Sequence, residues 1–404
     1  MRSVAPNPAL VVDYLTNGIG VIHALSLESI DMALLRPGWP PLECFGRYSR
    51  FPKLRISYWP RHGDSLVNTL LRLGEQIEGM GVLFPCSDAQ VETLMAARER
   101  LSGRFHVPLA SHLGPELLQK NWQCQLADRI GVPTPRYTTF VGGAVPDVRG
   151  FRFPLILKPS ARTEGAGKFV FRLRLLRTQA DFDSYIELVG REYHGRSFQL
   201  AESIPGPPDH LYTVGSYSNR DGRVLRSYTG RKLSQYPYSH GHGSICETVA
   251  VPNDLVRMAQ ALLNEAGFHG ISQVEFKLDP RDGIYKLMEI NPRSWSWIKL
   301  AACSGVNLPA IQYYDLSGDP RLKEALARPQ ENGRMFVNEY YVIHNRLSAE
   351  RRLIRESRKT RPVVFAAGLD GEWRLNLSFR AASLIRTVAR DVYRLLVEPR
   401  ANIP

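Results

Sequence analysis

The sequence predicts a mixed α/β and α+β fold, in which an N-terminal parallel-sheet domain precedes a region of antiparallel strands. Apolar runs at 9–14 and 82–85 are each followed by a helical pattern, which is typical of a parallel sheet covered by helices. After Pro135 short strand-like runs follow one another, and turn sequences at 219–222 and 279–283 separate several of them. A chain of 404 residues is long enough for more than one domain.

The N-terminal strands suggest where a ligand would lie. The strand at 9–14 leads into a turn at Asn17–Gly20, and the strand at 82–85 ends at Ser87 and Asp88. Because ligands of parallel sheets gather at the carboxyl ends of strands, both loops are candidate substrate contacts. The glycines of the first loop fall short of a dinucleotide fingerprint, and an ordinary tight turn is the alternative.

The rest of the chain is expected to be mainly antiparallel sheet with interspersed helices. Strand-like runs occur at 136–141, 154–158, 168–174, 198–202, 211–217, 223–229, 271–278, 284–290 and 362–367, and helices at about 178–193, 253–266 and 381–397. The helix at 381–397 is amphipathic, with Arg386, Arg390 and Arg394 on its basic face. We expect it either to pack on the enzyme body, or to make a weak contact with an acidic lipid surface or a nucleotide-linked substrate.

Composition and charge narrow the functional classes. The first residues contain no long apolar segment, and no run reaches the roughly 20 apolar residues of a membrane span, so we expect neither a secretory signal nor a spanning helix. The five cysteines are scattered without metal-ligand spacing, which predicts reduced thiols and a cytoplasmic protein. The net charge of +13 favours anionic ligands, and residues 321–404 hold 17 Lys and Arg against 9 Asp and Glu.

Two segments have the character of a nucleotide site. In 153–168 an apolar strand ends in Lys158, and a glycine-bearing loop leads to Lys168, so the loop could close over a polyphosphate. In 199–210 a strand runs into prolines, which leaves backbone groups free for an adenine edge, and Asp209 could accept a hydrogen bond from a ribose. A solvated hairpin and a plain loop are the respective alternatives.

The strongest pattern is a pair of acidic strands. Glu289 and Asn291 alternate along one strand and share a face, and the turn at 279–283 brings Glu275 beside Glu289. Two carboxylates and an amide oxygen on one face suit Mg²⁺, which prefers oxygen ligands and phosphate. Without a cation the carboxylates would repel each other across the strands. An exposed polar face with surface ion pairs is the alternative.

Together these motifs resemble the ATP-grasp superfamily over roughly residues 8–318. The segments Tyr228–Lys232, Gln235–Pro237 and Glu289–Arg293 resemble in particular its carboxylate–amine ligase branch, which includes D-aspartate ligase. The resemblance implies a pre-ATP-grasp domain at 1–115, a lid subdomain at 116–205, a catalytic subdomain at 206–320 and a basic extension at 321–404. It implies a ligase that uses ATP and Mg²⁺, with Mn²⁺ as an alternative metal, to join a carboxylate to an amine through an acyl phosphate.

The resemblance also implies a role for each candidate residue. ATP would be bound by Lys120, Lys158, Ser160, Gly165, Gly167, Lys168, Glu202, Ile204 and Asp209; Mg²⁺ by Glu275, Glu289 and Asn291; the reacting phosphoryl group by Arg293, Arg231 and Lys232; and the substrate by Ser87, Asp88, Trp295, Ser296 and Trp297. For the tryptophans, a place in the core is the alternative. Gln119, Ala201 and Ser203 depart from the usual pattern, which affects the expected shape of the adenine pocket.

Other functions remain open at this point. The alternatives are a carboxylase-type or kinase-type ATP-grasp reaction, a nucleotide sensor, and a basic nucleic-acid-binding protein. The sequence contains no recognised nucleic-acid-binding motif, and we expect no nucleic acid as a partner. The segment 238–244 is expected to be a flexible substrate-side loop, with a His-x-His metal pair as the alternative. The expected substrates are a small carboxylate and an amine, for example an amino acid or a nucleotide-linked precursor, and the family resemblance favours a homodimer.

Overall fold

The computed structural model describes residues 7–13, 15–38, 45–58, 65–108, 114–160, 173–237, 241–345 and 348–366. The chain forms two compact units and enters each of them more than once. The first unit comprises residues 1–108, 228–250 and 293–404, and the second comprises 109–227 and 251–292. The predicted helix at 381–397 and the loop residues Gly165, Gly167 and Lys168 lie outside the described residues. The division of the chain into domains at 1–115, 116–205, 206–320 and 321–404 remains a prediction.

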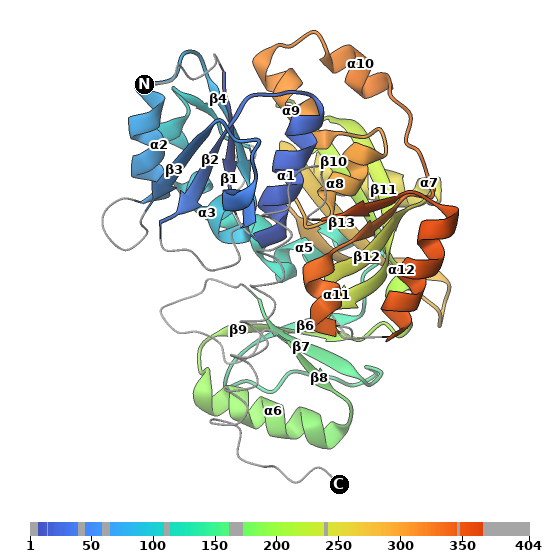
Figure 1. Ribbon diagram of the computed structural model, residues 1–404. Coiled ribbons are helices and arrows are strands. Elements are labelled where there is room, and N and C mark those ends of the chain that lie inside the picture. The colour runs from blue at the N-terminus through green and yellow to red at the C-terminus, as the bar shows by residue number, and fades with distance from the viewer. Residues whose placement is uncertain are drawn as a thin grey trace, which may run out of the picture. The chain divides into compact units, whose positions relative to one another are not determined.

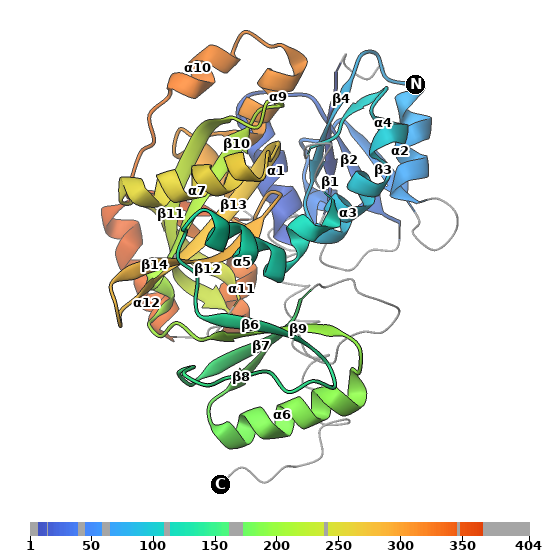
Figure 2. The same ribbon diagram turned by 180° about the vertical axis from the view of Figure 1, so that it is seen from behind.

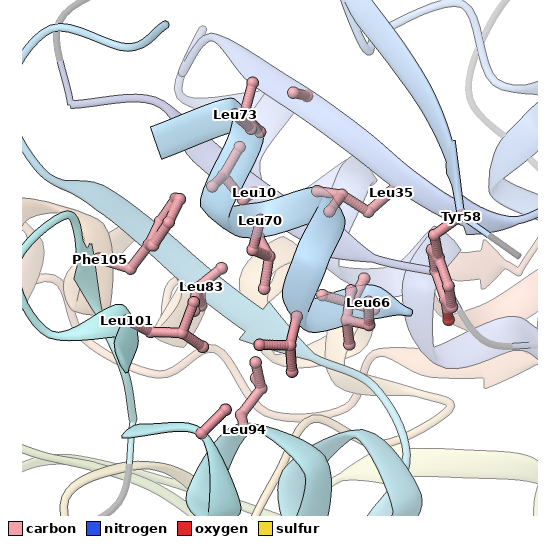
Figure 3. Packing of buried hydrophobic residues seen from close by; sticks show 14 of the residues in the cluster. Leu10, Leu35, Tyr58, Leu66, Leu70, Leu73, Leu83, Leu94, Leu101 and Phe105 are labelled. Atoms are coloured by element: carbon pink, nitrogen blue, oxygen red, sulfur yellow. The ribbon is translucent and has the colours of Figure 1, made fainter. Parts of the chain in front are cut away.

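The first unit contains the predicted parallel sheet, with its five strands in the order β3-β2-β1-β4-β5 (Figure 1). The strands are β1 (Ala9–Val12), β2 (Met32–Pro37), β3 (Leu54–Tyr58), β4 (Gly81–Pro85) and β5 (Phe105–His106). Leu10 and Val12 point to the face covered by helix α2 (Leu66–Gly74), where a leucine-rich core forms (Figure 3). Helices α1 (Leu15–Leu27) and α9 (Leu308–Ser317) cover the other face.

The predicted turn at Asn17–Gly20 is wrong, because these residues lie inside helix α1. Their glycines permit close packing. A Cβ atom at Gly20 would lie 2.9 Å from Cγ2 of Ile298, and one at Gly18 would collide with the Asp13 carboxylate. The missing side chain at Gly20 lets α1 approach helix α8 (Ile298–Cys303), and the missing side chain at Gly18 leaves room for the Asp13 carboxylate.

The first unit also contains one end of the seven-stranded sheet β14-β13-β10-β11-β12-β15-β16. This end consists of the later part of β11 (Val224–Tyr236), β12 (His242–Thr248), β15 (Met335–Val337) and β16 (Val363–Phe365), of which the last confirms the strand predicted at 362–367. Ile245, Met335 and Val337 form its core with helices α11 (Glu339–Asn345) and α12 (Ser348–Thr360). His242 to Ser244 lie in β12, so that part of the predicted loop is strand, and 238–240 lie outside the described residues.

Short helices complete the first unit. They are η1 (Phe45–Tyr48), α3 (Asp88–Ala96), α4 (Arg98–Leu101) and α10 (Leu322–Ala327). Across the described part of the whole chain, no helix has the length and apolar character that crossing a membrane requires.

The second unit contains a four-stranded antiparallel sheet in the order β6-β9-β7-β8, with helix α6 (Gln179–Glu192) along one face (Figure 2). Its strands are β6 (Tyr137–Val141), β7 (Leu155–Pro159), β8 (Arg174–Leu176) and β9 (Ser197–Glu202). Phe182, Ile186 and Val189 of α6 pack on Leu157 and Leu200 of the sheet. Their spacing of three and four residues is that of an amphipathic helix, and α6 confirms the helix predicted at 178–193.

The remainder of the second unit is built on strands β14-β13-β10 and the first residues of β11. The elements are η2 (Pro115–Leu118), α5 (Lys120–Arg129), η3 (Pro208–His210), β10 (Leu211–Ser218), α7 (Asn253–Glu265), β13 (Gly270–Asp279) and β14 (Ile284–Asn291). Both predicted hairpin turns are confirmed. Each contains a glycine in the left-handed region, Gly222 with φ 77° and Gly283 with φ 73°.

Candidate functional site

The hairpin of β13 and β14 brings the predicted acidic pair together. Glu275 lies directly opposite Glu289, and Gln273 lies opposite Asn291. Side chains directly opposite each other on antiparallel strands share one face, so two carboxylates and two amides form a polar row on this sheet. The alternation in the sequence and the turn at 279–283 therefore predicted this arrangement correctly.

Lys120, at the first residue of α5, supplies a positive charge to this row. Its ammonium group forms an ion pair with the Glu289 carboxylate, and the two side chains are 16% and 25% exposed. The ion pair offsets the repulsion between the neighbouring carboxylates. Because both groups still reach solvent, Lys120 is free to exchange its carboxylate partner for a phosphate.

Gln273 was not predicted, although it connects the members of the row. Its side-chain amide donates to Oε1 of Glu275 at 3.3 Å, and its Oε1 accepts from Nδ2 of Asn291 at 3.3 Å. The Asn291 amide is thereby oriented with its nitrogen toward Gln273. Its position two residues before Glu275 on the same strand face is the signal that could have identified it.

These residues fit a magnesium ion. Mg²⁺ is commonly bound through one or two carboxylates, with phosphate oxygens and water completing its shell. Glu275, Glu289 and the Asn291 amide provide such oxygens on one face. In the described part of the chain no three His, Cys, Asp or Glu side chains cluster as metal ligands.

A second group of polar residues connects α5 to the end of β7. The backbone N–H of Lys120 donates to the Ser160 carbonyl at 3.2 Å, and Asn121 Nδ2 donates to Ser160 Oγ at 2.8 Å. Burial raises the pKa of the Cys124 thiol, while the positive charges of Lys158 and Lys120 act in the opposite direction. The charges of both lysines therefore act on the same thiol.

In the segment expected to bind adenine, some polar groups already have hydrogen-bond partners within the protein, and one oxygen has none among the described residues. The Glu202 carboxylate is mostly buried, accepts from the Arg152 N–H at 3.0 Å and pairs with Arg281 at 3.1 Å. The Ile204 carbonyl accepts from Lys277 Nζ at 2.8 Å. Oδ1 of Asp209 is buried and has no hydrogen-bond partner among the described residues, which leaves it available to a ribose hydroxyl.

The remaining predicted residues lie in the first unit. Arg293 pairs with Asp88 at 2.6 Å, so the structure brings together a predicted phosphoryl ligand and a predicted substrate residue. Ser87 caps helix α3 by accepting from the Gln90 N–H at 3.3 Å. A local structural role therefore accounts for Ser87 without any ligand.

Arg231 and Lys232 are successive residues of β11 and point to opposite faces. Arg231 pairs with Glu247 at 2.6 Å, and Arg361 pairs with the same carboxylate. Lys232 is buried at 5% exposure and donates to the Gly241 carbonyl at 3.2 Å. Glu247 was not predicted, because only the pairing of β11 with β12 brings it to Arg231. Arg361 was not predicted either, because it reaches Glu247 from the residue that follows α12.

Trp295 and Trp297 belong to the core of the first unit. They are 2% and 1% exposed, and their rings lie 6.3 and 6.0 Å from the Tyr228 ring. Ser296 between them is also buried. This packing agrees with the alternative that the tryptophans are core residues, and their contact with a substrate remains a prediction.

Part of the chain is similar in sequence to known proteins. Residues 220–339 match the family described as ATP-grasp in the biosynthetic pathway with Ter operon. D-aspartate ligase from Enterococcus faecium (strain Aus0004) is 24% identical over 276 residues, which cover 65% of this chain and 66% of that ligase, slightly less than two thirds of its length.

Solved structures share the fold at low sequence identity. The biotin carboxylase domain of Hydrogenobacter thermophilus 2-oxoglutarate carboxylase, determined with ADP, magnesium and bicarbonate, has a TM-score of 0.57 at 18% identity, covering 77% of this chain and 70% of that one. L-amino acid ligase from Bacillus licheniformis has a TM-score of 0.55 at 14% identity, with coverage of 81% and 77%. The chain therefore shares the fold of these enzymes, and its residues 220–339 are similar to an ATP-grasp family.

Proposed function

We propose that this protein is an ATP- and magnesium-dependent carboxylate–amine ligase. The observation that carries the proposal is the polar row of Glu275, Glu289 and Asn291, with Lys120 paired to one of its carboxylates. Similarity to D-aspartate ligase supports a reaction that forms an amide. An amino acid is the substrate class that we expect on at least one side of the new bond.

In this proposal the candidate residues of the second unit bind ATP and the metal ion. Lys120 and Lys158 hold the phosphates of ATP, the main chain around Ile204 holds adenine, and Asp209 accepts from ribose. Glu275, Glu289 and Asn291 would hold Mg²⁺, for which Mn²⁺ could substitute. The metal ion supplies charge neutralisation to the transferring phosphoryl group, whose transfer depends mainly on alignment and electrostatics.

The reaction proceeds in two balanced steps. A carboxylate oxygen attacks the γ-phosphorus, the bond to the β–γ bridging oxygen breaks, and ADP and an acyl phosphate form. The amine then attacks the acyl carbon, loses a proton, and releases inorganic phosphate. We assign Arg293 and Arg231 to the developing negative charge, Arg293 with Asp88 and Arg231 with Glu247 as their orienting partners. The buried Lys232 acts less directly, by holding the Gly241 carbonyl.

Trapping with hydroxylamine tests the proposal. Hydroxylamine converts an acyl phosphate into a hydroxamate, which iron(III) reveals by colour. We expect ADP release and hydroxamate in equal amounts when Mg²⁺, ATP and pools of amino acids and small carboxylic acids are supplied. The ligase would be contradicted if ADP were released without hydroxamate from any pool and a phosphorylated hydroxyl compound or a carboxylated product were detected instead. That result would indicate a kinase-type or carboxylase-type reaction.

A further inference from the structure

A polar pocket lies beside the β13–β14 turn in the second unit, apart from the acidic row. Its volume is about 240 Å³. The residues that line it are Arg136, Gly150, Arg152, Glu202, Arg281, Asp282 and Lys286. Four of these side chains are cationic and two are anionic, so the pocket carries a positive excess. Of the residues predicted to bind ATP, only Glu202 lines it.

Two of the cations are already fixed by carboxylates. Arg281 binds Asp279 through its Nη2 at 2.6 Å and Glu202 through its Nη1 at 3.1 Å. Lys286 binds Asp279 at 2.8 Å and Asp282 at 2.7 Å. The hydrogen bonds from Arg281, followed by those from Lys286, hold the pKa of Asp279 well below its usual range. Arg281 and Lys286 are therefore held beside the pocket by the carboxylates of Asp279 and Asp282.

The other two cations have no such partner. Neither Arg136 nor Arg152 forms an ion pair with a carboxylate in the part of the chain that the structure describes. Arg136 is nevertheless fixed, because its Nη1 donates to the Gly150 carbonyl at 2.7 Å, its Nη2 donates to the Arg149 carbonyl at 3.3 Å, and its guanidinium lies 4.9 Å from the centre of the Phe151 ring. Each of these two nitrogens keeps a second N–H for another acceptor. Two guanidinium groups on one pocket are thus available to an anion from solution.

We propose that this pocket binds a phosphate or phosphomonoester group. A guanidinium group presents paired N–H donors that match two oxygens of a tetrahedral phosphate, and Arg is the side chain best suited to such recognition. A dianion would also neutralise the excess charge of the pocket. The bound anion would compete with the Glu202 carboxylate for Arg281. Because Glu202 is the last residue of β9, this competition would act on the start of the segment expected to hold adenine.

Calorimetric titration of the full chain with inorganic phosphate and with methyl phosphate tests this site. At constant ionic strength we expect the double variant Arg136→Ala/Arg152→Ala to weaken phosphate binding at least about tenfold. Arg149→Ala is the matched control, because the Arg149 side chain is exposed, pairs with the neighbouring Asp147 and does not line the pocket, while the substitution keeps the main-chain carbonyl that accepts from Arg136. We expect this control to bind phosphate as the unaltered chain does. Tighter binding of methyl phosphate would identify an organic phosphate as the ligand, and tighter binding of inorganic phosphate would identify the free ion.

A second variant separates this pocket from the proposed ATP site. Lys158→Ala should leave phosphate binding to the pocket intact, since Lys158 does not line it. Loss of phosphate binding in Lys158→Ala, together with unchanged binding in the double arginine variant, would overturn the pocket and leave the ligase proposal standing. If the double variant is unfolded by circular dichroism, Arg152→Ala alone serves, because its exposed side chain supports no described contact.

Discussion

Replacing Glu289 by glutamine tests the acidic row most sharply. The substitution keeps the size of the side chain and removes one negative charge. Loss of a preorganised electrostatic group at a reacting phosphoryl centre typically costs about 3–4 kcal/mol of transition-state stabilisation. We therefore expect ADP release by Glu289→Gln to fall at least about 10²-fold at saturating Mg²⁺.

The same substitution should hardly change stability, because two small effects oppose each other. The ion pair with Lys120 is lost, and since the two side chains are 16% and 25% exposed it contributes about 1 kcal/mol or less. The repulsion across the strands between Glu275 and Glu289, which costs about 0.2–1 kcal/mol, is relieved. The free energy of unfolding should therefore change by less than about 1 kcal/mol.

The assay combines coupled detection of ADP with chemical denaturation. Glu265→Gln, at the exposed end of α7, is the control for loss of one negative charge and should keep full activity. Near-normal ADP release by Glu289→Gln would refute the metal assignment. A large loss of stability would refute the balance of forces described above, because it would mean that Glu289 holds the fold.

Three further outcomes follow from contacts in the second unit. Asp279→Asn should lower the free energy of unfolding at pH 7 by about 3 kcal/mol, because it leaves Arg281 and Lys286 without their buried partner. The folded-state pKa of Asp279 is depressed, so this contribution is present above about pH 4 and fades at lower pH; denaturation curves in which the difference grows toward acid would contradict it. The thiol of Cys124 has a raised pKa, so iodoacetamide at pH 8 should alkylate it at least about tenfold more slowly in the folded than in the urea-unfolded protein, and equal rates in peptide mapping would disprove this. Lys158→Met should raise the Kd for ADP about tenfold or more by calorimetry, whereas an unchanged Kd would remove Lys158 from the nucleotide site.

Sequence patterns predicted the sheet elements best where a turn or a buried apolar run was distinctive. Strands β1 and β4 are short runs of fully buried residues, and the turns at 219–222 and 279–283 marked the hairpins. Strands β2 and β3 were missed, because a short apolar run such as 32–37 has no periodicity that separates strand from helix. The chain also returns to the first unit after leaving it, which depends on long-range packing and has no local signal.

The candidate site was predictable where it depends on one hairpin and less so elsewhere. Glu275 and Glu289 are close in sequence, and a single turn fixes their register. Glu247 meets Arg231 only through a β11–β12 pairing interrupted by register shifts, which the sequence does not reveal. The burial of Trp295 and Trp297 likewise depends on packing against Tyr228, a residue distant in sequence.

Transfer of an isotope from the carboxylate to phosphate tests the central claim most directly. Once hydroxylamine trapping has identified the acid, that acid is supplied with both carboxylate oxygens as ¹⁸O, together with ATP, Mg²⁺ and the amine. Attack of the amine on an acyl phosphate predicts that each inorganic phosphate released carries one ¹⁸O and that the amide keeps the other. Unlabelled phosphate released alongside the amide would contradict the acyl-phosphate route and, with it, the proposed function.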